Sequence, residues 1–259
     1  MKVLDLFSGI GGFSLGLERT GGFETVAFCE IDPYCQKVLK KHWPEVPIYE
    51  DVREVTAARL VRDGIGADVI TGGFPCQDIS VAGKQAGISG ERSGLWSELA
   101  RIISEVRPRY AILENVTALI GGDRGRWFGR VLGDLAEIGY DAEWHCIPAS
   151  ALGAHHHRDR VWVIAYPNSN GLERFNNCRN NEQTSGTVFK GGEVARASDA
   201  HRAGIWRAEP GVDRVADGVP RRVDRLKGLG NAVVPQIPEL IGHAIISYEK
   251  SRQRRHPAD

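Results

Sequence analysis

The chain has 259 residues, of which 42% are hydrophobic and 25% charged, and its 33 basic residues balance 33 acidic ones. This length suits one large α/β domain with a small inserted lobe, and zero net charge gives no overall sign of a nucleic-acid partner. No apolar run approaches the roughly 20 residues of a membrane span, and five cysteines without a CxxC pair argue against a disulfide framework or a zinc knuckle. We therefore expect a cytoplasmic protein without membrane contacts.

The amino-terminal segment predicts a nucleotide-type binding unit. Residues 2–6 form a buried strand pattern, and a glycine-rich turn follows at once and opens a helix. The second predicted strand, 25–29, ends at Glu30, about 20 positions past the glycines, which suits a hydrogen bond to ribose hydroxyls. A packing turn and a solvent-facing strand end are the alternatives. The pair of features favours a ligand but does not separate dinucleotides from S-adenosylmethionine.

Two elements follow before the next buried strand. Asp32-Pro33 begins a predicted helix, and a short strand at 47–49 leads to Asp51. The Asp51 carboxylate could face an adenine amine, and capping a helix is an equally good local interpretation.

Cys76 follows the buried strand pattern of residues 67–70 across two glycines and a proline, which we expect to turn the chain sharply out of the strand. The thiol would then lie at the carboxyl edge of a parallel sheet, where ligands bind in open α/β folds. The alternative is a small buried cysteine in a tight turn. Residues 77–94 lack helical or strand periodicity, so they are either a lid beside a nucleophile or a surface loop.

A second carboxylate is predicted at the same sheet edge. A helix capped by Ser93 runs to about residue 106, and the buried strand 110–113 then ends at Glu114. Beside a thiol in one crevice, this carboxyl becomes a candidate proton donor rather than a cap or a surface charge.

The remaining pattern predicts a helix around 132–138 and two antiparallel strands, 140–149 and 160–166. From 167 to about 225 the periodicity is lost, which indicates a loop-rich lobe or a partly ordered excursion. Order returns at 223–229 and in a helix that begins near residue 236, whereas the basic tail 250–259 is expected to fray.

Between the two antiparallel strands lie three histidines, 155–157, and then Arg158 and Arg160. Consecutive strand positions point to opposite faces, so the three imidazoles are not expected to share a metal ion. The two arginines would share a face, which suits clamping an anion or a carbonyl oxygen; two surface charges are the alternative.

A thiol, a carboxylate and an arginine pair beside a cofactor loop suit covalent activation of a pyrimidine. A thiolate that adds to C6, with a proton donated to N3, makes C5 nucleophilic enough to accept a methyl group. At this point the chain resembles the C5-cytosine DNA methyltransferases of the bacterial and phage modification type. The matching motifs, in family order, are Asp5-Leu6-Phe7-Ser8-Gly9-Ile10-Gly11-Gly12, Glu30, Gly73-Phe74-Pro75-Cys76-Gln77, Glu114-Asn115-Val116, Arg158-Asp159-Arg160 and Gly230-Asn231-Ala232-Val233.

The resemblance implies an α/β fold of the Rossmann-like, S-adenosylmethionine-dependent type, with a mostly parallel sheet, an antiparallel strand pair and a small target-recognition lobe. It implies a catalytic and cofactor-binding domain at 1–166, a target-recognition region at 167–225 and a segment at 226–259 that returns to the catalytic domain. Cys76 would be the nucleophile, Glu114 would contact N3, Arg160 would hold O2, and Arg158 would help to position the nucleophile loop and backbone. The implied cofactor contacts are Phe7, Gly9, Ile10, Gly11, Glu30, Ile31, Asp51, Val52, Pro75, Leu95, Asn231 and Val233.

The implied partner is double-stranded DNA, with Gln77 and Ser80 of the mobile loop facing it and the target base flipped out of the stack. Residues 151–259 carry 17 Lys and Arg against 12 Asp and Glu, which suits phosphate contacts. We expect a monomer that needs no metal, and a separate cognate restriction endonuclease is possible.

Three departures from the family pattern affect these expectations. Histidines stand where a Pro-Gln pair is common, Ala232 replaces a frequent serine, and the recognition lobe is short. The short lobe leaves open an RNA-directed enzyme of the tRNA-methylating branch. A catalytically silent DNA-binding subunit and an NAD-dependent oxidoreductase also fit parts of the pattern, although the oxidoreductase leaves the Pro-Cys-Gln and Glu-Asn-Val motifs unexplained.

Overall fold

The structure, a computed structural model, describes residues 1–75, 94–168 and 222–255 of the chain. Its elements in chain order are β1 (Lys2–Leu6), α1 (Gly12–Arg19), β2 (Glu24–Cys29), α2 (Pro33–His42), β3 (Ile48–Tyr49), η1 (Val52–Glu54), α3 (Ala57–Arg62), β4 (Val69–Gly73), α5 (Gly94–Val106), β5 (Tyr110–Val116), α6 (Ala118–Gly121), η2 (Gly122–Gly125), α7 (Arg126–Glu137), β6 (Tyr140–Pro148), η3 (Ala149–Leu152), β7 (Asp159–Pro167), α10 (Arg222–Asn231) and α11 (Gln236–Arg255).

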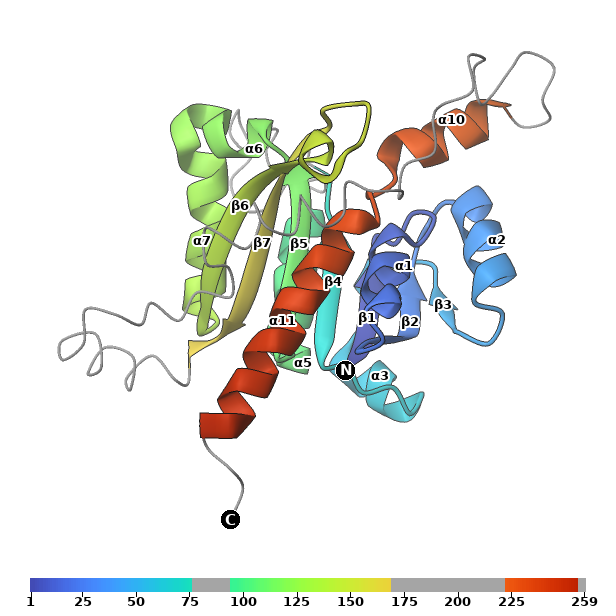
Figure 1. Cartoon of the computed structure of the whole chain (residues 1–259). Coiled ribbons are helices and arrows are strands. Elements are labelled where there is room, and N and C mark those ends of the chain that lie inside the picture. The colour runs from blue at the N-terminus through green and yellow to red at the C-terminus, as the bar shows by residue number, and fades with distance from the viewer. Residues whose placement is uncertain (76–93, 169–221, 256–259) are drawn as a thin grey trace.

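The strands form one seven-stranded sheet in the order β3-β2-β1-β4-β5-β7-β6. The first five strands of this order run parallel, whereas β7 is antiparallel to both β5 and β6 (Figure 1). The strand order reverses between β1 and β4, and such a switch point opens a crevice at the carboxyl ends of the strands. The predicted Rossmann-like sheet with its antiparallel pair is thereby confirmed.

Helices cover both faces of the sheet, because alternate strand residues point to opposite sides. On one face, Val3, Val69 and Ile112 pack with α1 and α11; on the other, Leu4 and Ile70 pack with α5 and α7. Figure 1 shows α11 crossing the sheet diagonally beside α1, with α10 above the carboxyl ends of the strands.

The carboxyl-terminal segment is joined closely to the amino-terminal helix. A Cβ built on Gly16 would lie 2.1 Å from the carbonyl oxygen of Pro235, and one on Gly12 would lie 2.5 Å from that of Val233. Only glycine permits this approach of two backbones. The segment that follows α10 is therefore packed tightly against α1, although the two lie far apart in the sequence.

Several boundaries differ from those that the sequence predicts. The strand β4 continues through Gly72 and Gly73, so the expected sharp exit does not occur at the glycines. Their role is space, because a Cβ on Gly72 would lie 3.3 Å from Leu99. The strand β5 runs past Glu114 to Val116, where its antiparallel partner β7 keeps the ladder paired.

The carboxyl-terminal helix and two short elements also differ from what the sequence predicts. The helix α11 continues to Arg255, so the tail does not fray at residue 250. The short elements η1 and α3 carry no strong periodicity and were not predicted. The proposed recognition region lies almost wholly outside the described residues, as does Ser93, the expected helix cap. In the described part of the chain, no helix is long and apolar enough to cross a membrane.

Candidate active site

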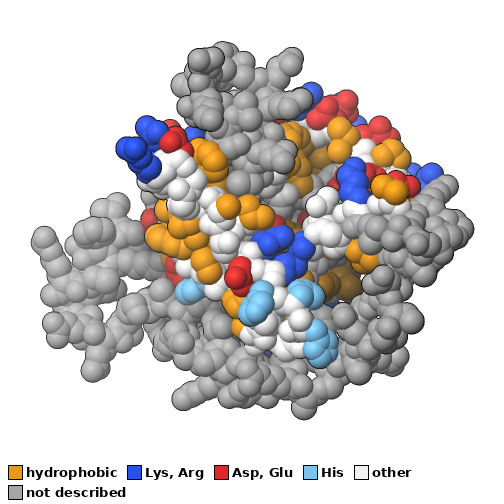
Figure 2. All heavy atoms as spheres, turned by 90° about the horizontal axis from the view of Figure 1, so that it is seen from above, with side chains coloured by type: hydrophobic (Ala, Val, Ile, Leu, Met, Phe, Trp, Pro, Cys, Tyr) orange, Lys and Arg blue, Asp and Glu red, His pale blue; other side chains and the backbone are white. Residues whose placement is uncertain are grey.

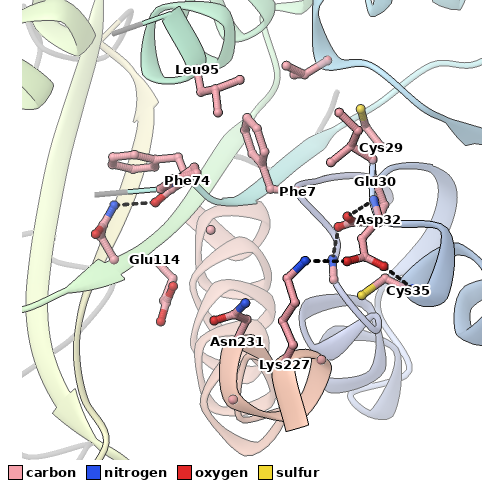
Figure 3. Close-up of a pocket in the computed structure, with 18 of the residues that line it drawn as sticks. Phe7, Cys29, Glu30, Asp32, Cys35, Phe74, Leu95, Glu114, Lys227 and Asn231 are labelled. Atoms are coloured by element: carbon pink, nitrogen blue, oxygen red, sulfur yellow. Dashed lines mark hydrogen bonds and ion pairs between the residues drawn. The ribbon is translucent and has the colours of Figure 1, made fainter. Parts of the chain in front are cut away.

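A cavity of about 900 Å³ opens at the carboxyl ends of β1, β2, β4 and β5. Figure 2 looks down on the molecule from above and shows basic, acidic and histidine side chains close together near the centre of this face. Figure 3 shows the interior, with Phe7, Phe74 and Leu95 on one side and Glu114 and Asn231 on another. The cavity thus lies at the switch point of the sheet, where an α/β fold binds its ligand.

Most of the residues that the sequence singles out reach this cavity. The lining includes the expected cofactor contacts Phe7, Gly9, Glu30, Ile31, Asp51, Val52, Pro75, Leu95 and Asn231, together with Glu114, Arg158 and Arg160. The other expected contacts, Ile10, Gly11 and Val233, are not among the described residues that line it. Cys76, Gln77 and Ser80 lie outside the described residues, although Pro75 brings the chain to the cavity wall.

The Glu30 carboxylate is hydrogen-bonded to the backbone of the glycine loop. Phe7 and Gly9 both have φ of 54°, a left-handed conformation that is costly for phenylalanine and recurs at ligand sites. The Glu30 carboxylate accepts the backbone N–H of Gly9 at 2.7 Å and that of Asp32 at 2.7 Å. Each carboxylate oxygen keeps a further acceptor position, so a ligand hydroxyl could still donate to it.

The wall next to Glu30 combines an exposed apolar side chain with a second acid. Ile31 is 76% exposed, and Phe7, Val52 and Leu95 lie around the same cavity. Asp51 accepts the N–H of Arg53 at 2.9 Å, so the capping role is observed; the carboxylate also lines the cavity, and its contact with a ligand stays a prediction. Apolar faces flanked by hydroxyl-binding acids suit a nucleoside, which is the part of S-adenosylmethionine that these residues would hold.

Glu114 and Arg160, which both line the cavity, form an ion pair in which Arg160 Nε lies 2.8 Å from Glu114 Oε1. Burial raises the pKa of Glu114, and the positive charges of Arg160 and Arg158 oppose this rise. A Cβ on Gly73 would lie 3.3 Å from Glu114 Oε2, so a glycine at this point of β4 leaves room for the carboxylate. A carboxyl group whose pKa is raised is suited to proton transfer with a bound base.

Asn115 was part of a motif in the sequence, but its role became visible only in the structure. Its buried amide donates to the carbonyl oxygen of Phe74 at 2.8 Å, and its Oδ1 accepts the N–H of Val116. The Phe74 ring packs 4.9 Å from that of Trp96. Both contacts fix the backbone two residues before Cys76.

Arg158 takes a different partner from Arg160. It precedes β7 with φ of 38°, and its guanidinium donates to the carbonyl oxygens of Gly230 at 2.8 Å and Ala232 at 2.6 Å. The two arginines were expected to share one face and one partner. Both line the same cavity, but their partners differ.

Two further sets of contacts became visible only in the structure. Lys227 of α10 forms an ion pair at 2.8 Å with Asp32, which also caps α2 (Figure 3). Asp5 is wholly buried beneath the glycine loop and accepts the hydroxyls of Thr71 at 2.7 Å and Ser14 at 2.8 Å. Burial outweighs these hydrogen bonds and raises the pKa of Asp5 to about 7.

The histidines at 155–157 are exposed, and His157 Nδ1 lies 3.5 Å from the Ser150 hydroxyl. Within the described ranges, no three His, Cys, Asp or Glu side chains come together as metal ligands would.

The fold and this site define a Rossmann-like protein with a large cavity at its switch point. Residues 1–198 match the family model of the C-5 cytosine-specific DNA methylases, and the chain belongs to this family. It is 38% identical over 169 residues to the type II methyltransferase M2.BsuMI of Bacillus subtilis, covering 64% of this chain and 42% of that protein.

A second relative, the type II methyltransferase M1.ScrFI of Lactococcus lactis, is 36% identical over 165 residues, covering 64% of this chain and 41% of the relative. The Dnmt2 methyltransferase structure of S. pombe has a TM-score of 0.54 at 21% identity over 75% of this chain and 58% of that one, which shows a shared fold. The chain thus matches about two fifths of the length of these curated relatives.

Proposed function

We propose that the protein is a DNA (cytosine-5-)-methyltransferase that uses S-adenosyl-L-methionine and acts on a cytosine flipped out of the duplex. The observation that carries the proposal is the Glu114–Arg160 pair, which shares one cavity with Glu30 and the glycine loop. A proton donor and a hydrogen-bond clamp for a base thus adjoin a nucleoside site, and Pro75 leads directly from this cavity into Cys76.

In this reaction the Cys76 thiolate adds to C6 of the cytosine, and its electron pair forms the new S–C6 bond. Glu114 delivers its proton to N3, while Arg160 holds O2 and limits the charge that develops there. The C5–C6 π electrons shift to form a C4–C5 double bond, and the N3–C4 π electrons bind the proton at N3, so that the ring becomes an enamine whose C5 is nucleophilic. S-adenosyl-L-methionine, when bound, supplies an electrophilic methyl group. Loss of the C5 proton to solvent, departure of the Cys76 thiolate and return of the N3 proton to Glu114 then restore the aromatic ring.

The remaining assignments follow from the family resemblance. Gln77 and Ser80 would face the DNA, and residues 167–225 would read the target sequence. Phosphate contacts from the mildly basic second half would hold the duplex. The chain would act as a monomer in a modification system, with a cognate endonuclease as a separate protein.

A radiolabelled methyl-transfer assay with nucleoside analysis tests this function. The protein is incubated with labelled cofactor and either plasmid DNA or tRNA, beside Cys76→Ser and the matched control Cys146→Ser, which alters an exposed cysteine on β6. We expect 5-methylcytosine in DNA, retained by the control and abolished in Cys76→Ser.

Two results would contradict the proposal: label in adenine or N4-methylcytosine, or full activity of Cys76→Ser. Transfer to tRNA alone would assign the RNA-methylating branch. Bisulfite sequencing of DNA from cells that express the chain would then reveal the recognised sequence.

A further inference from the structure

We infer that Arg158 is a positioning residue for the cofactor side of the cavity, acting through the carboxyl-terminal segment rather than on the target base. This inference rests on the proposed function, because it names the role of one residue within that site. The observation behind it is the pair of hydrogen bonds from one guanidinium to the carbonyl oxygens of Gly230 and Ala232.

The backbone of Arg158 is held in an unusual shape. Its φ of 38° lies in the left-handed region, which an arginine occupies only when surrounding contacts compensate. The preceding turn is anchored by the Ala149 N–H, which donates to the carbonyl oxygen of His157 at 2.7 Å. This geometry directs the side chain out of the β7 ladder and toward α10, whereas Arg160, inside the strand, reaches Glu114.

The carbonyls that Arg158 binds flank Asn231 and end α10. The last carbonyl groups of a helix lack intrahelical partners, so a cationic side chain nearby can donate hydrogen bonds to them. Burial and the neighbouring Arg160 lower the pKa of Arg158, yet an arginine remains charged at any working pH. Two charge-assisted hydrogen bonds therefore fix the segment that bears Asn231, which lines the cavity.

The same segment reaches the glycine loop directly. The carbonyl oxygen of Val233 lies against Gly12, where any Cβ would clash at 2.5 Å, and Gly228 packs where a Cβ would meet Tyr34 at 3.2 Å. Lys227 holds the other end of this segment through Asp32. Arg158 thus connects the turn before β7, beside the Glu114–Arg160 pair, to the segment that contains Asn231 and packs near the glycine loop.

The test measures cofactor binding rather than turnover. Isothermal titration of S-adenosyl-L-methionine is compared among the wild type, Arg158→Ala, Arg158→Lys and the control Arg62→Ala, which removes a 72% exposed arginine paired with its neighbour Asp63 on the far side of the fold. Loss of two charge-assisted bonds predicts affinity that is about 10- to 100-fold weaker for Arg158→Ala. Lysine cannot bind both carbonyl oxygens as the planar guanidinium does, so the cofactor affinity of Arg158→Lys should lie between those of the wild type and Arg158→Ala.

Two further measurements separate this role from a DNA contact. Amide exchange of residues 229–235 should be faster in both Arg158 variants without cofactor, and affinity for plasmid DNA fragments should change less than about threefold. Arg158→Lys carries the test if the alanine variant does not fold. Unchanged cofactor affinity with DNA affinity weakened tenfold or more would overturn the inference, as would unchanged exchange. Failure of the wild type to bind the cofactor would instead refute the proposed function.

Discussion

Replacement of Asp5 by asparagine is predicted to change how stability depends on pH. The carboxyl is wholly buried, and its pKa rises from 3.8 to about 7 because burial disfavours the charge. A group with a raised folded-state pKa contributes its full stability below the unfolded pKa and loses it as the pH rises to the folded pKa. The wild type should therefore weaken between about pH 4 and pH 7 and stay at the lower level above pH 7.

The magnitude follows from the two pKa values. Each pH step of one costs about 1.4 kcal/mol in that window, so the free energy of unfolding falls by about 2.5 kcal/mol from pH 5 to pH 8 through this group. Asparagine is neutral throughout and can still hydrogen-bond to Thr71 and Ser14. The free energy of unfolding of the variant should not fall in this way, so between pH 5 and pH 8 it should rise relative to that of the wild type by the same amount.

Urea unfolding at pH 5 and pH 8 measures the difference. At about 2 kcal/mol per molar urea, the midpoint of the variant relative to the wild type should move by about 1 M between the two pH values. Asp68→Asn, which removes a carboxylate that directly precedes β4 and accepts the backbone N–H of Lys2, is the matched control. Parallel pH profiles of the wild type and Asp5→Asn would refute the assignment of a raised pKa to Asp5.

Two further predictions concern the cavity. Gly73→Ala places a Cβ 3.3 Å from Glu114 Oε2 and should displace the carboxylate by a few tenths of an ångström. We expect the methyl-transfer rate to fall about tenfold and the free energy of unfolding to fall by about 1 kcal/mol. Gly129→Ala on α7, where a Cβ meets open space, is the control, and equal rates for the two variants would contradict the reasoning. Lys227→Met removes the ion pair with Asp32, and because Lys227 is 64% exposed we expect only a two- to fivefold weaker cofactor affinity, measured by titration. The gap to the wild type should close in high salt, and Lys37→Met on α2 should show no such gap.

The sequence was informative wherever chemistry and periodicity coincided. The alternation of buried strands with helices predicted the parallel sheet, and the strand ends at Glu30 and Glu114 predicted the edge at which the cavity opens. The predicted ends of strands were wrong where a local sequence signal has two possible structural meanings. The glycines before Phe74 signal a turn in the sequence, yet in the fold they make space for Leu99 and Glu114 inside a strand.

Partners across long sequence distances could not be predicted in the same way. Arg158 and Arg160 are two residues apart in an alternating pattern, so the sequence assigned them one face and a shared task. A positive φ before the strand begins sends Arg158 to carbonyls more than 70 positions away instead. The same limit applies to Asp5, which belongs to a sequence motif but whose complete burial and two hydroxyl partners are visible only in the structure.

The sequence alone determined which chemical groups this protein has, and in what order, because motif identity and strand periodicity are local properties of the chain. Only the tertiary structure decided which of those groups meet. That choice depends on close backbone approach at a few glycines and on how burial alters each ionisable side chain, and both arise when distant segments pack together.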